Sequence, residues 1–379
     1  MSRFEGTLAE PQPSVMHVIT GLDAGGAETQ LGQLLLAMRE RGACHDVVSL
    51  TPGGAVRHRL EAEGVRVRDL GMVRGRPSLV GLVRLAWLIR AECPAIVQSW
   101  MYHADLAALT ALKLSGRKQR TRLVWGIRCS DLDLARYGRA LRMAVRAGAR
   151  LSPRPDAVAV NSAAGQAAHE RLGYRPRRFV LIENGIDTAR FHPNAEARSR
   201  LRALLGIAPD EPVVVHVARV DPMKDHATLF AALDRLDGVR ALLIGAGTEH
   251  LPAHPAVIAL GRRADVPALL AIGDLIVLPS AFGEGFSNAL AEGMACALPA
   301  VATDVGDARR IVGDTGLVVP PRDAAAFASA IRRLLDEPPE VRVSRGQAAR
   351  QRIEQEFSLA RFVAAHEALY ASLATSTQT

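Results

Sequence analysis

Aromatic residues make up only 4% of this chain of 379 residues, so it offers few stacking platforms for single-stranded nucleic acid. No helix-turn-helix, zinc-finger or RNA-recognition signature is present either, and we do not expect a nucleic-acid partner. Cysteine is equally scarce: the four cysteines lie far apart and form no CxxC pair, which argues against a disulfide framework or a zinc site and predicts reduced, partly buried thiols. They are Cys44, Cys93, Cys129 and Cys296.

Long apolar runs are also missing. The stretch LVGLVRLAWLI is interrupted by Arg84, and no run reaches the 18 residues that a membrane-spanning helix needs. The first residues, MSRFEGTLAEPQPS, are polar and lack the apolar core of a signal peptide, which predicts a cytosolic protein. With 49% hydrophobic and 23% charged residues, the composition is that of a folded globular chain rather than a disordered one.

The charge that is present is unevenly distributed. The formal net charge is +8; residues 1–190 carry 28 Lys and Arg against 17 Asp and Glu, whereas residues 191–379 carry 19 against 22. The first half is therefore +11 and the second −3, which favours an anionic partner for the first half, such as lipid headgroups or a phosphorylated small molecule. Nearly all the positive charge is arginine; the chain has three lysines, Lys113, Lys118 and Lys224.

Short β-branched runs alternate with helical patterns from one end of the chain to the other, the rhythm of parallel α/β sheets. The predicted helices include Ala27–Arg41 and Ala104–Leu114, and the chain after Pro320 is predicted to be mainly helical. The predicted strands are Val15–Thr20, Asp46–Thr51, Ala95–Ser99, Leu123–Ile127, Ala157–Val160 and Phe179–Ile182 in the first half, and Pro212–Val217, Ala241–Ile244, Ala256–Leu260, Leu275–Leu278 and Ala300–Thr303 in the second.

This rhythm pauses at ENGIDTARFHPNAEA, so two doubly wound α/β domains with a cleft between them are the simplest architecture. The predicted parts are a polar tail (1–14), a first domain (15–190), a linker (191–210), a second domain (211–355) and a C-terminal helix (356–379). Ligands of such sheets bind at the carboxyl ends of the strands, so the strand-to-helix loops are the candidates for chemistry.

Two loops combine glycine or cations with a strand end. Gly25 and Gly26 lie between a predicted strand and a helix, where free N–H groups can bind an anion; a tight turn that needs glycine only for its geometry is an equal alternative. Arg219 and Lys224 follow the first strand of the second domain, where two cations can converge on a diphosphate. Taken alone, these two residues also fit an ordinary solvated loop.

A third loop, PSAFGEGFSNALAEGMA, is the most informative. Glu284 lies in the loop, Ser287 is a good N-cap for the following helix, and Glu292 lies in that helix one turn beyond Asn288. The backbone N–H groups of Gly285, Phe286, Ser287 and Asn288 can bind a phosphate or a sugar oxygen. The carboxylates of Glu284 and Glu292 can accept hydrogen bonds from vicinal hydroxyls. A solvent-facing pair of glutamates beside a helix start is the plain alternative.

These residues together carry a family resemblance. Glu284 and Glu292 form an E-x7-E pair, and the segment through MACALPAVATDVGDARRIVGDTGLVVP resembles the C-terminal half of retaining glycosyltransferases of family 4. Arg219 and Lys224 match that family's diphosphate-binding R…K, and the loop at Gly25 matches its N-terminal glycine loop. The segments GAG at 245–247 and LGRRADVP at 260–267 are similar to further landmarks, in the right order, so that the resemblance covers residues 15–375.

The resemblance implies a GT-B fold, in which two Rossmann-like domains face each other across a cleft and the last helix crosses back to the first domain. It also implies transfer from a nucleotide-sugar, expected to be a UDP- or GDP-sugar, with retention of configuration and without a bound metal or other cofactor. Glu292 would bind the donor ribose and Glu284 the transferred sugar, while Arg219 and Lys224 would hold the diphosphate. The acceptor would be a glycan or lipid-linked hydroxyl in the synthesis of a cell-surface polysaccharide, lipopolysaccharide or glycolipid.

Some residues depart from the family pattern. Ala297 and Ala218 stand where glycine is usual or frequent, and Arg128 follows the strand Leu123–Ile127 where many relatives have a histidine. Arg128 is therefore a candidate for contact with a phosphate or the acceptor, and His103, after the strand Ala95–Ser99, is the histidine expected nearest the cleft and a candidate catalytic residue. A surface or helix-start histidine is an equal alternative. The D-x-D of Asp131 and Asp133 is interpreted as part of a helix cap rather than a metal site.

Five arginines are spaced like one stripe of a helix, which is typical of a basic amphipathic helix on an anionic membrane. An ordinary solvated stripe is the alternative; the residues are Arg136, Arg139, Arg142, Arg146 and Arg150. With that stripe, a cytosolic protein would lie at the inner face of the cell membrane.

Three other functions remain open at this point. A nucleotide-sugar epimerase of the same fold would convert the donor without an acceptor, and a non-catalytic nucleotide-sugar sensor would bind the donor without turnover. A dinucleotide oxidoreductase is disfavoured because no GxGxxG follows the first strand.

Overall fold

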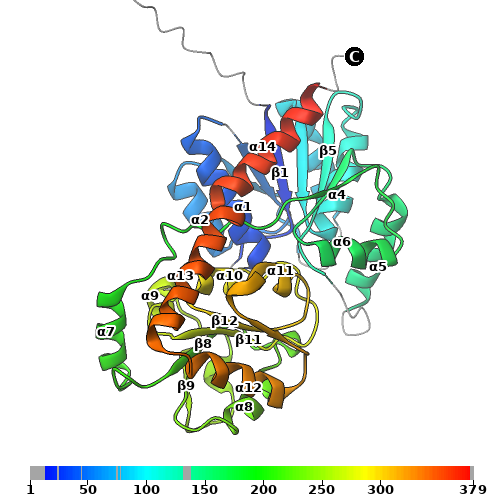
Figure 1. Cartoon of the computed structure of the whole chain (residues 1–379). Helices are drawn as coiled ribbons and strands as arrows, with labels where there is room; N and C mark the ends of the chain where they lie inside the picture. Colours follow the sequence, from blue (N-terminus) through cyan, green and yellow to red (C-terminus); the bar gives the residue numbers. More distant parts are fainter. Residues whose placement is uncertain are drawn as a thin grey trace, which may run out of the picture.

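The computed structural model describes residues 13–23, 25–43, 45–73, 76, 78–130 and 138–375, which build two parallel β-sheets, each flanked by helices (Figure 1). The first sheet has the strand order β3-β2-β1-β4-β5-β6-β7. Its strands are β1 Val15–Ile19, β2 His45–Ser49, β3 Val67–Asp69, β4 Ile96–Trp100, β5 Arg122–Ile127, β6 Ala157–Val160 and β7 Phe179–Leu181. All of the strands predicted for the first half are present, and β3 is an additional short edge strand.

The helices of the first half cover both faces of this sheet. One face packs against α1 (Gly26–Glu40), α2 (Ala55–Ala62) and α14 (Leu359–Thr375). The other face packs against α3 (Leu79–Glu92), α4 (Tyr102–Leu114) and α5 (Arg139–Leu151), while α6 (Ala163–Arg171) follows β6. The sheet is thus buried on both sides, which explains its nearly continuous apolar strands.

The second sheet has the order β10-β9-β8-β11-β12-β13. Its strands are β8 Val213–Val217, β9 Arg240–Ile244, β10 Val257–Ala259, β11 Leu275–Leu278, β12 Ala300–Thr303 and β13 Leu317–Val319, of which β13 was not predicted. One face packs against α7 (Ala195–Leu204), α9 (Val266–Leu270), α10 (Asn288–Ala295), α11 (Ala308–Val312) and α13 (Pro339–Glu356). The other face packs against α8 (His226–Leu233) and α12 (Ala324–Leu335).

The chain passes between the two sheets twice, and the two passages run side by side. Ile186 and Ser358 form a parallel bridge, in which Ile186 N–H donates to the carbonyl of Phe357 at 2.8 Å and Leu359 N–H donates to Ile186 at 2.9 Å. Gly185 has no room for a side chain, because a Cβ there would lie 2.6 Å from the Cβ of Phe362. The second passage brings α14 back onto the first domain, as Figure 1 shows in red, and this part of the predicted architecture is confirmed.

Helix α7 lies within the segment expected to be a linker and packs its Ala197 and Leu201 into the core of the second domain. The exact domain limits stay a prediction. No helix in the described part of the chain is long and apolar enough to cross a bilayer.

Candidate active site

The strand order reverses between β1 and β4 in the first sheet and between β8 and β11 in the second. The three predicted loops follow β1, β8 and β11, and His103 follows β4. In the first sheet, β1 and β4 are neighbours, and their following helices α1 and α4 lie on opposite faces. In the second sheet, β8 and β11 are neighbours, and they are followed by α8 and α10 on opposite faces. Such switch points are where open α/β sheets bind ligands, because the diverging loops leave room between them.

Lys224 is held in place by two local caps. The Asp221 carboxylate accepts a hydrogen bond from Met223 N–H at 3.0 Å and starts the short 3-10 turn Pro222–Lys224. Asp225, in a left-handed conformation, then caps α8 by accepting from Thr228 N–H at 3.2 Å. Lys224 therefore leaves the backbone between two fixed turns, at the carboxyl end of β8.

The Lys224 ammonium reaches the carboxylate of Glu284, with 2.5 Å between Nζ and Oε1. The same carboxylate accepts a hydrogen bond from Ser280 Oγ at 2.6 Å. Both ionic side chains are well buried, 15% exposed for Lys224 and 7% for Glu284. The loops after β8 and β11 thus place a buried ion pair at the switch point of the second sheet, as expected for two of the four proposed ligand-binding side chains.

Arg219 is on the same loop as Lys224 but occupies a different environment. Its guanidinium is 63% exposed and pairs with Asp221 at 2.8 Å. The structure therefore brings Lys224 and Glu284 into direct contact, whereas Arg219 is engaged with its own loop and faces solvent.

Helix α10 begins where the sequence predicts, with Ser287 at the N-cap position, but the Ser287 side chain makes no capping hydrogen bond. Glu292 is half-buried on this helix, and burial raises the pKa of its carboxyl group to about 7, with a smaller opposing effect from Arg190. Phe286 is buried and packs edge-to-face on Phe357, so its side chain belongs to the core. The unsatisfied N–H groups of the first turn make the N-terminus of α10 suited to an anion.

The glycine loop of the first domain lies opposite this helix. Gly25 is the N-cap of α1 and has no side chain to close the first turn. A Cβ at Gly26 would lie 3.8 Å from the side-chain nitrogen of Asn288, so the N-termini of α1 and α10 face each other. Gly285 also lies against the first domain, because a Cβ there would be 3.0 Å from the Asn161 amide oxygen.

Arg128 is part of a hydrogen-bonded chain across the same junction. Arg128 Nη1 donates to Asn184 Oδ1 at 2.8 Å, and Asn184 Nδ2 donates to Asn288 Oδ1 at 2.7 Å. The guanidinium lies over the ring of Trp100, 4.5 Å from its centroid, and burial lowers the pKa of Arg128 to about 9. Within the described chain, its Nε and Nη2 atoms are buried without a hydrogen-bond partner.

Further contacts between the domains were not predicted either. Ser130 Oγ donates to the backbone carbonyl of Glu284. Asp307, next to α11, accepts hydrogen bonds from Ala163 N–H at 2.8 Å and Ala164 N–H at 2.9 Å, so a carboxylate of the second domain caps α6 of the first. Asp307 was one acidic residue in a turn, and nothing in its spacing indicated a partner 143 residues away.

The remaining predicted residues lie around this centre. His103 is the second residue of α4, half-buried, at the carboxyl end of β4 and hence on the edge of the first sheet that bears Gly25. Of the arginine stripe, Arg139, Arg146 and Arg150 are exposed on α5 and Arg142 is half-buried. The remaining two predictions, Arg136 and the D-x-D at 131–133, lie outside the described residues.

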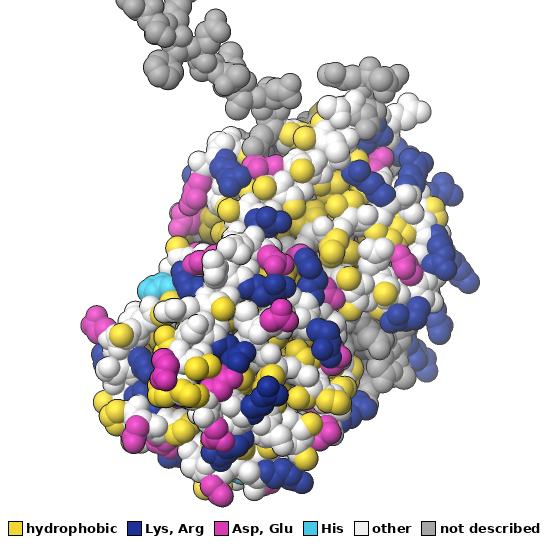
Figure 2. All heavy atoms as spheres, in the orientation of Figure 1, with side chains coloured by type: hydrophobic (Ala, Val, Ile, Leu, Met, Phe, Trp, Pro, Cys, Tyr) yellow, Lys and Arg dark blue, Asp and Glu magenta, His cyan; other side chains and the backbone are white. Residues whose placement is uncertain are grey.

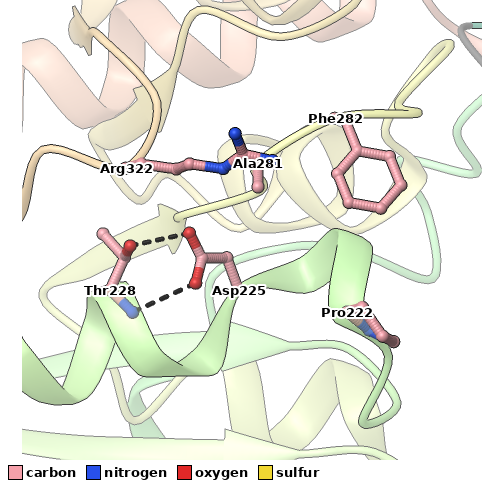
Figure 3. Close-up of a pocket in the computed structure, with 6 residues that line it drawn as sticks. All are labelled: Pro222, Asp225, Thr228, Ala281, Phe282 and Arg322. Carbon is pink, nitrogen blue, oxygen red and sulfur yellow. Dashed lines mark hydrogen bonds between the residues drawn. The ribbon is translucent and has the colours of Figure 1, made fainter. Parts of the chain in front are cut away.

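An open pocket lies on the second domain beside the buried ion pair. Figure 3 shows Phe282 and Pro222 on one side of it, and Arg322 above Asp225, whose carboxylate accepts hydrogen bonds from the hydroxyl and the N–H of Thr228. The loop after β11 is tied to the loop after β8 by Ala281 N–H, which donates to the carbonyl of Met223 at 2.8 Å. Two of the loops that line this pocket are thus tied together by a backbone hydrogen bond.

Two family models match successive parts of the chain. The model "Glycosyltransferase Family 4" matches residues 24–190, and "Glycosyl transferases group 1" matches residues 211–337. The chain belongs to the family 4 glycosyltransferases. The second match contains the whole second sheet, and the first contains β2 to β7 of the first sheet and begins just after β1.

Proteins of similar sequence are named as glycosyltransferases as well. The chain is 30% identical over 213 residues to a D-inositol 3-phosphate glycosyltransferase of Kineococcus radiotolerans, an alignment that covers 47% of this chain and 48% of that protein. It is 29% identical to a 2-deoxystreptamine N-acetyl-D-glucosaminyltransferase of Streptomyces fradiae, over 81% of each chain. The chain spans about half the length or less of the inositol phosphate relatives it matches.

The fold of this family 4 member is GT-B, as the resemblance implied. The crystal structure of Anabaena Alr3699/HepE in complex with UDP and glucose superposes with a TM-score of 0.81, at 24% identity, over 95% of this chain and 100% of that chain. The two chains therefore share one fold over nearly their whole length.

Proposed function

We propose that this chain is a retaining glycosyltransferase that transfers a sugar from a nucleoside diphosphate sugar to a hydroxyl group of a glycan or lipid-linked acceptor. The observation that carries the proposal is the buried Lys224–Glu284 pair at the β8/β11 switch point, beside the uncapped N-terminus of α10. A cation and a helix N-terminus at one point suit a diphosphate, and a carboxylate beside them suits the hydroxyls of the attached sugar.

In this proposal the bond from the sugar C1 to the diphosphate oxygen breaks, and its electron pair goes to that oxygen. Lys224, Arg219 and the N–H groups of residues 285–288 stabilise the negative charge that develops there, which is where preorganised donors lower a barrier most. The acceptor oxygen bonds to C1 on the same face, and its proton passes to the departing phosphate. No side chain of the chain then has to act as a nucleophile.

The other candidate residues surround this centre. Glu292 would accept hydrogen bonds from the ribose hydroxyls, and Gly25 and Gly26 would let the backbone of the first domain approach the diphosphate. His103 and Arg128 come from the first domain, where the acceptor would bind, and Arg128 brings a positive charge that forms no ion pair with a carboxylate of the described residues. Two of the relatives are named for anionic acceptors, inositol 3-phosphate and malate, which supports an anionic group on the acceptor side.

The donor is proposed to be a UDP-sugar before a GDP-sugar, because the Anabaena neighbour binds UDP and UDP-glucose. We further propose a role in the synthesis of a cell-surface polysaccharide, lipopolysaccharide or glycolipid at the inner face of the cell membrane, which fits the +11 charge of residues 1–190.

A thermal-shift screen of the purified chain against UDP-, GDP- and ADP-sugars tests the donor, and proton NMR of the product then reports the anomeric configuration. Arg219→Ala should lower turnover by about 100-fold, whereas Arg235→Ala, an exposed arginine at the end of α8, should leave it unchanged. Conversion of the donor without an acceptor would indicate an epimerase instead, and binding without any conversion would indicate a sensor. An inverted product would contradict the retaining mechanism.

A further inference from the structure

Helix α3 exposes an apolar face to solvent. Leu79, Val80, Val83 and Trp87 are each at least 62% exposed, and their spacing places the last three along one stripe of the helix. Val73, just before the helix, is exposed as well. A contiguous apolar patch of this kind on a globular protein marks an interaction surface.

The helix that carries this patch is firmly fixed. Ser78 Oγ caps it by accepting from Gly81 N–H at 3.1 Å, and the opposite face of the helix buries Leu85 and Ile89 in the core of the first domain. The helix is thus apolar on both sides, although only one side packs against the protein. Packing in the core explains the apolar residues on the inner side of α3. It does not explain the exposed apolar residues on its outer side.

The surroundings of this patch are basic. Arg84 lies inside the apolar stripe, and α3, α4 and α5 form one layer in which α4 contacts both neighbours. The exposed α5 arginines Arg139, Arg146 and Arg150 have no carboxylate of the described chain within ion-pair distance, whereas many arginines of the second domain are paired. Figure 2 shows dark-blue side chains gathered along the edge of the upper domain where Figure 1 places α5.

A small basic pocket continues this layer between α4 and the segment that follows α5. It encloses about 180 Å³ and holds two of the chain's three lysines, with Asp156 as its one carboxylate among the described residues. The basic residues that line it are Lys113, Lys118, Arg122, Arg154 and Arg177. Its size and charge suit a phosphate group.

We propose that the outer surface of the α3–α4–α5 layer docks on an anionic lipid bilayer. The apolar face of α3 enters the boundary between headgroups and acyl chains, while the α5 arginines and the basic pocket bind lipid phosphates. The sequence indicated only the arginines of α5 as membrane contacts. The structure adds the exposed apolar face of α3, which can insert into the bilayer, whereas arginines alone bind a membrane weakly. A second copy of this chain is a poor occupant, because two such faces would bring like charges together.

The surface lies in a useful place for the proposed function. Helix α3 follows β3 and therefore begins at the carboxyl edge of the first sheet. Gly25 and His103 lie at the same edge. Leu79, the first residue of α3, is thus at the end of the patch nearest the candidate site. A lipid-linked acceptor would therefore reach the first domain from the membrane side. Docking itself does not depend on the proposed transfer reaction, and the two can fail separately.

Trp87 provides a direct test, since the other two tryptophans, Trp100 and Trp125, are fully buried. The full chain is mixed with vesicles of phosphatidylcholine alone or with about 30% phosphatidylglycerol. With the anionic vesicles, the Trp87 emission should shift to shorter wavelength and be quenched by brominated acyl chains, and Trp87→Phe should abolish both signals while the protein still sediments with the vesicles. Sedimentation should weaken at high salt, because screening shortens to ~3 Å at 1 M.

Two sets of variants separate the apolar and the basic contribution. Val80→Ser with Val83→Ser should lower vesicle affinity by about tenfold or more, and Arg139→Gln with Arg146→Gln and Arg150→Gln by on the order of 100-fold. Leu204→Ser, an equally exposed leucine on α7 of the second domain, should have no effect. All variants should keep the melting temperature and the UDP-induced thermal shift of the unchanged chain, because they alter solvent-exposed positions only.

The proposal is overturned if anionic vesicles neither sediment the chain nor quench Trp87, or if the double serine variant binds like the unchanged chain. A concentration-dependent dimer that the double serine variant abolishes would also overturn it, since the patch would then be covered by a second copy. A chain that docks but transfers no sugar would refute the proposed function and leave the docking surface in place.

Discussion

Replacement of Glu284 by glutamine removes the charge partner of Lys224 while keeping the side chain's shape. The two groups lie 2.5 Å apart and are 7% and 15% exposed, so the variant leaves a buried ammonium without a counter-charge. Loss of one partner of a buried pair costs about 3–5 kcal/mol of folding free energy. The glutamine oxygen can still accept a hydrogen bond from Lys224, so we expect a loss nearer 3 kcal/mol, or roughly 5–10 °C in melting temperature.

The same change should strengthen the binding of UDP. In the unliganded protein a diphosphate must compete with Glu284 for Lys224, and in Glu284→Gln that competitor is neutral. A tenfold gain in UDP affinity would raise the stabilisation by UDP from about 2.7 to about 4.1 kcal/mol at a concentration 100 times the original Kd. Sugar transfer should fall at the same time, because the carboxylate proposed to bind the sugar is gone.

Thermal unfolding with and without UDP measures both effects, and Glu354→Gln is a matched control, because Glu354 forms a surface ion pair with Arg350 on α13. The control should behave like the unchanged chain. If UDP stabilises Glu284→Gln no more than it stabilises the unchanged chain, Lys224 does not bind the diphosphate, and the central contact of the proposed site is wrong.

Three further outcomes are expected. Ala297 has a left-handed backbone (φ +58°), so Ala297→Gly should stabilise the protein by about 1 kcal/mol in urea unfolding, and a loss of stability would contradict this strain. Burial lowers the pKa of His17 well below its ordinary value and that of His45 to about 4, so the contribution of these two histidines to stability should be constant above pH 7 and fall by up to about 1.4 kcal/mol per pH unit and histidine between pH 6.5 and 4. Urea midpoints of the unchanged chain and of His17→Gln with His45→Gln measure this contribution, and a difference between the two chains that does not change with pH would refute it. Because the pKa of Glu292 is raised to about 7, the calorimetric UDP affinity should rise from pH 6 to 8 as the carboxylate forms, and should rise less over this range in Glu292→Gln, where the terminal phosphate of UDP still titrates but the side chain does not.

The predicted fold was correct because it rests on strands whose two faces are both buried. Runs such as Leu275–Leu278 are apolar throughout, and the proline and serine that follow this run mark the strand end. The short edge strands Val67–Asp69 and Leu317–Val319 were missed. Two of the three residues of the first are charged, and the second is enclosed by Gly316 and Pro320, which read as turn residues.

Site residues such as Lys224 and Glu284 were predictable, because the sequence of their own loops indicates a binding role. Contacts between segments that are distant in the sequence were not predictable. Asn184 reads as a turn residue next to Gly185, and only the folded chain shows that it links Arg128 to Asn288. The apolar stretch that begins at Leu79 reads as a buried helix, because a sequence does not show which of two apolar faces the protein covers.

The return of α14 has a consequence for biosynthesis. Phe362, Leu369 and Tyr370 of α14 pack in the same core as Val15 and Ile19 of β1. This first strand lies more than 300 residues earlier in the chain. While the ribosome is still making the second domain, α1 and α2 can already pack on that face of the first sheet, but the part that α14 covers stays open to other nascent chains and chaperones. The first domain to emerge is therefore the last to be completed.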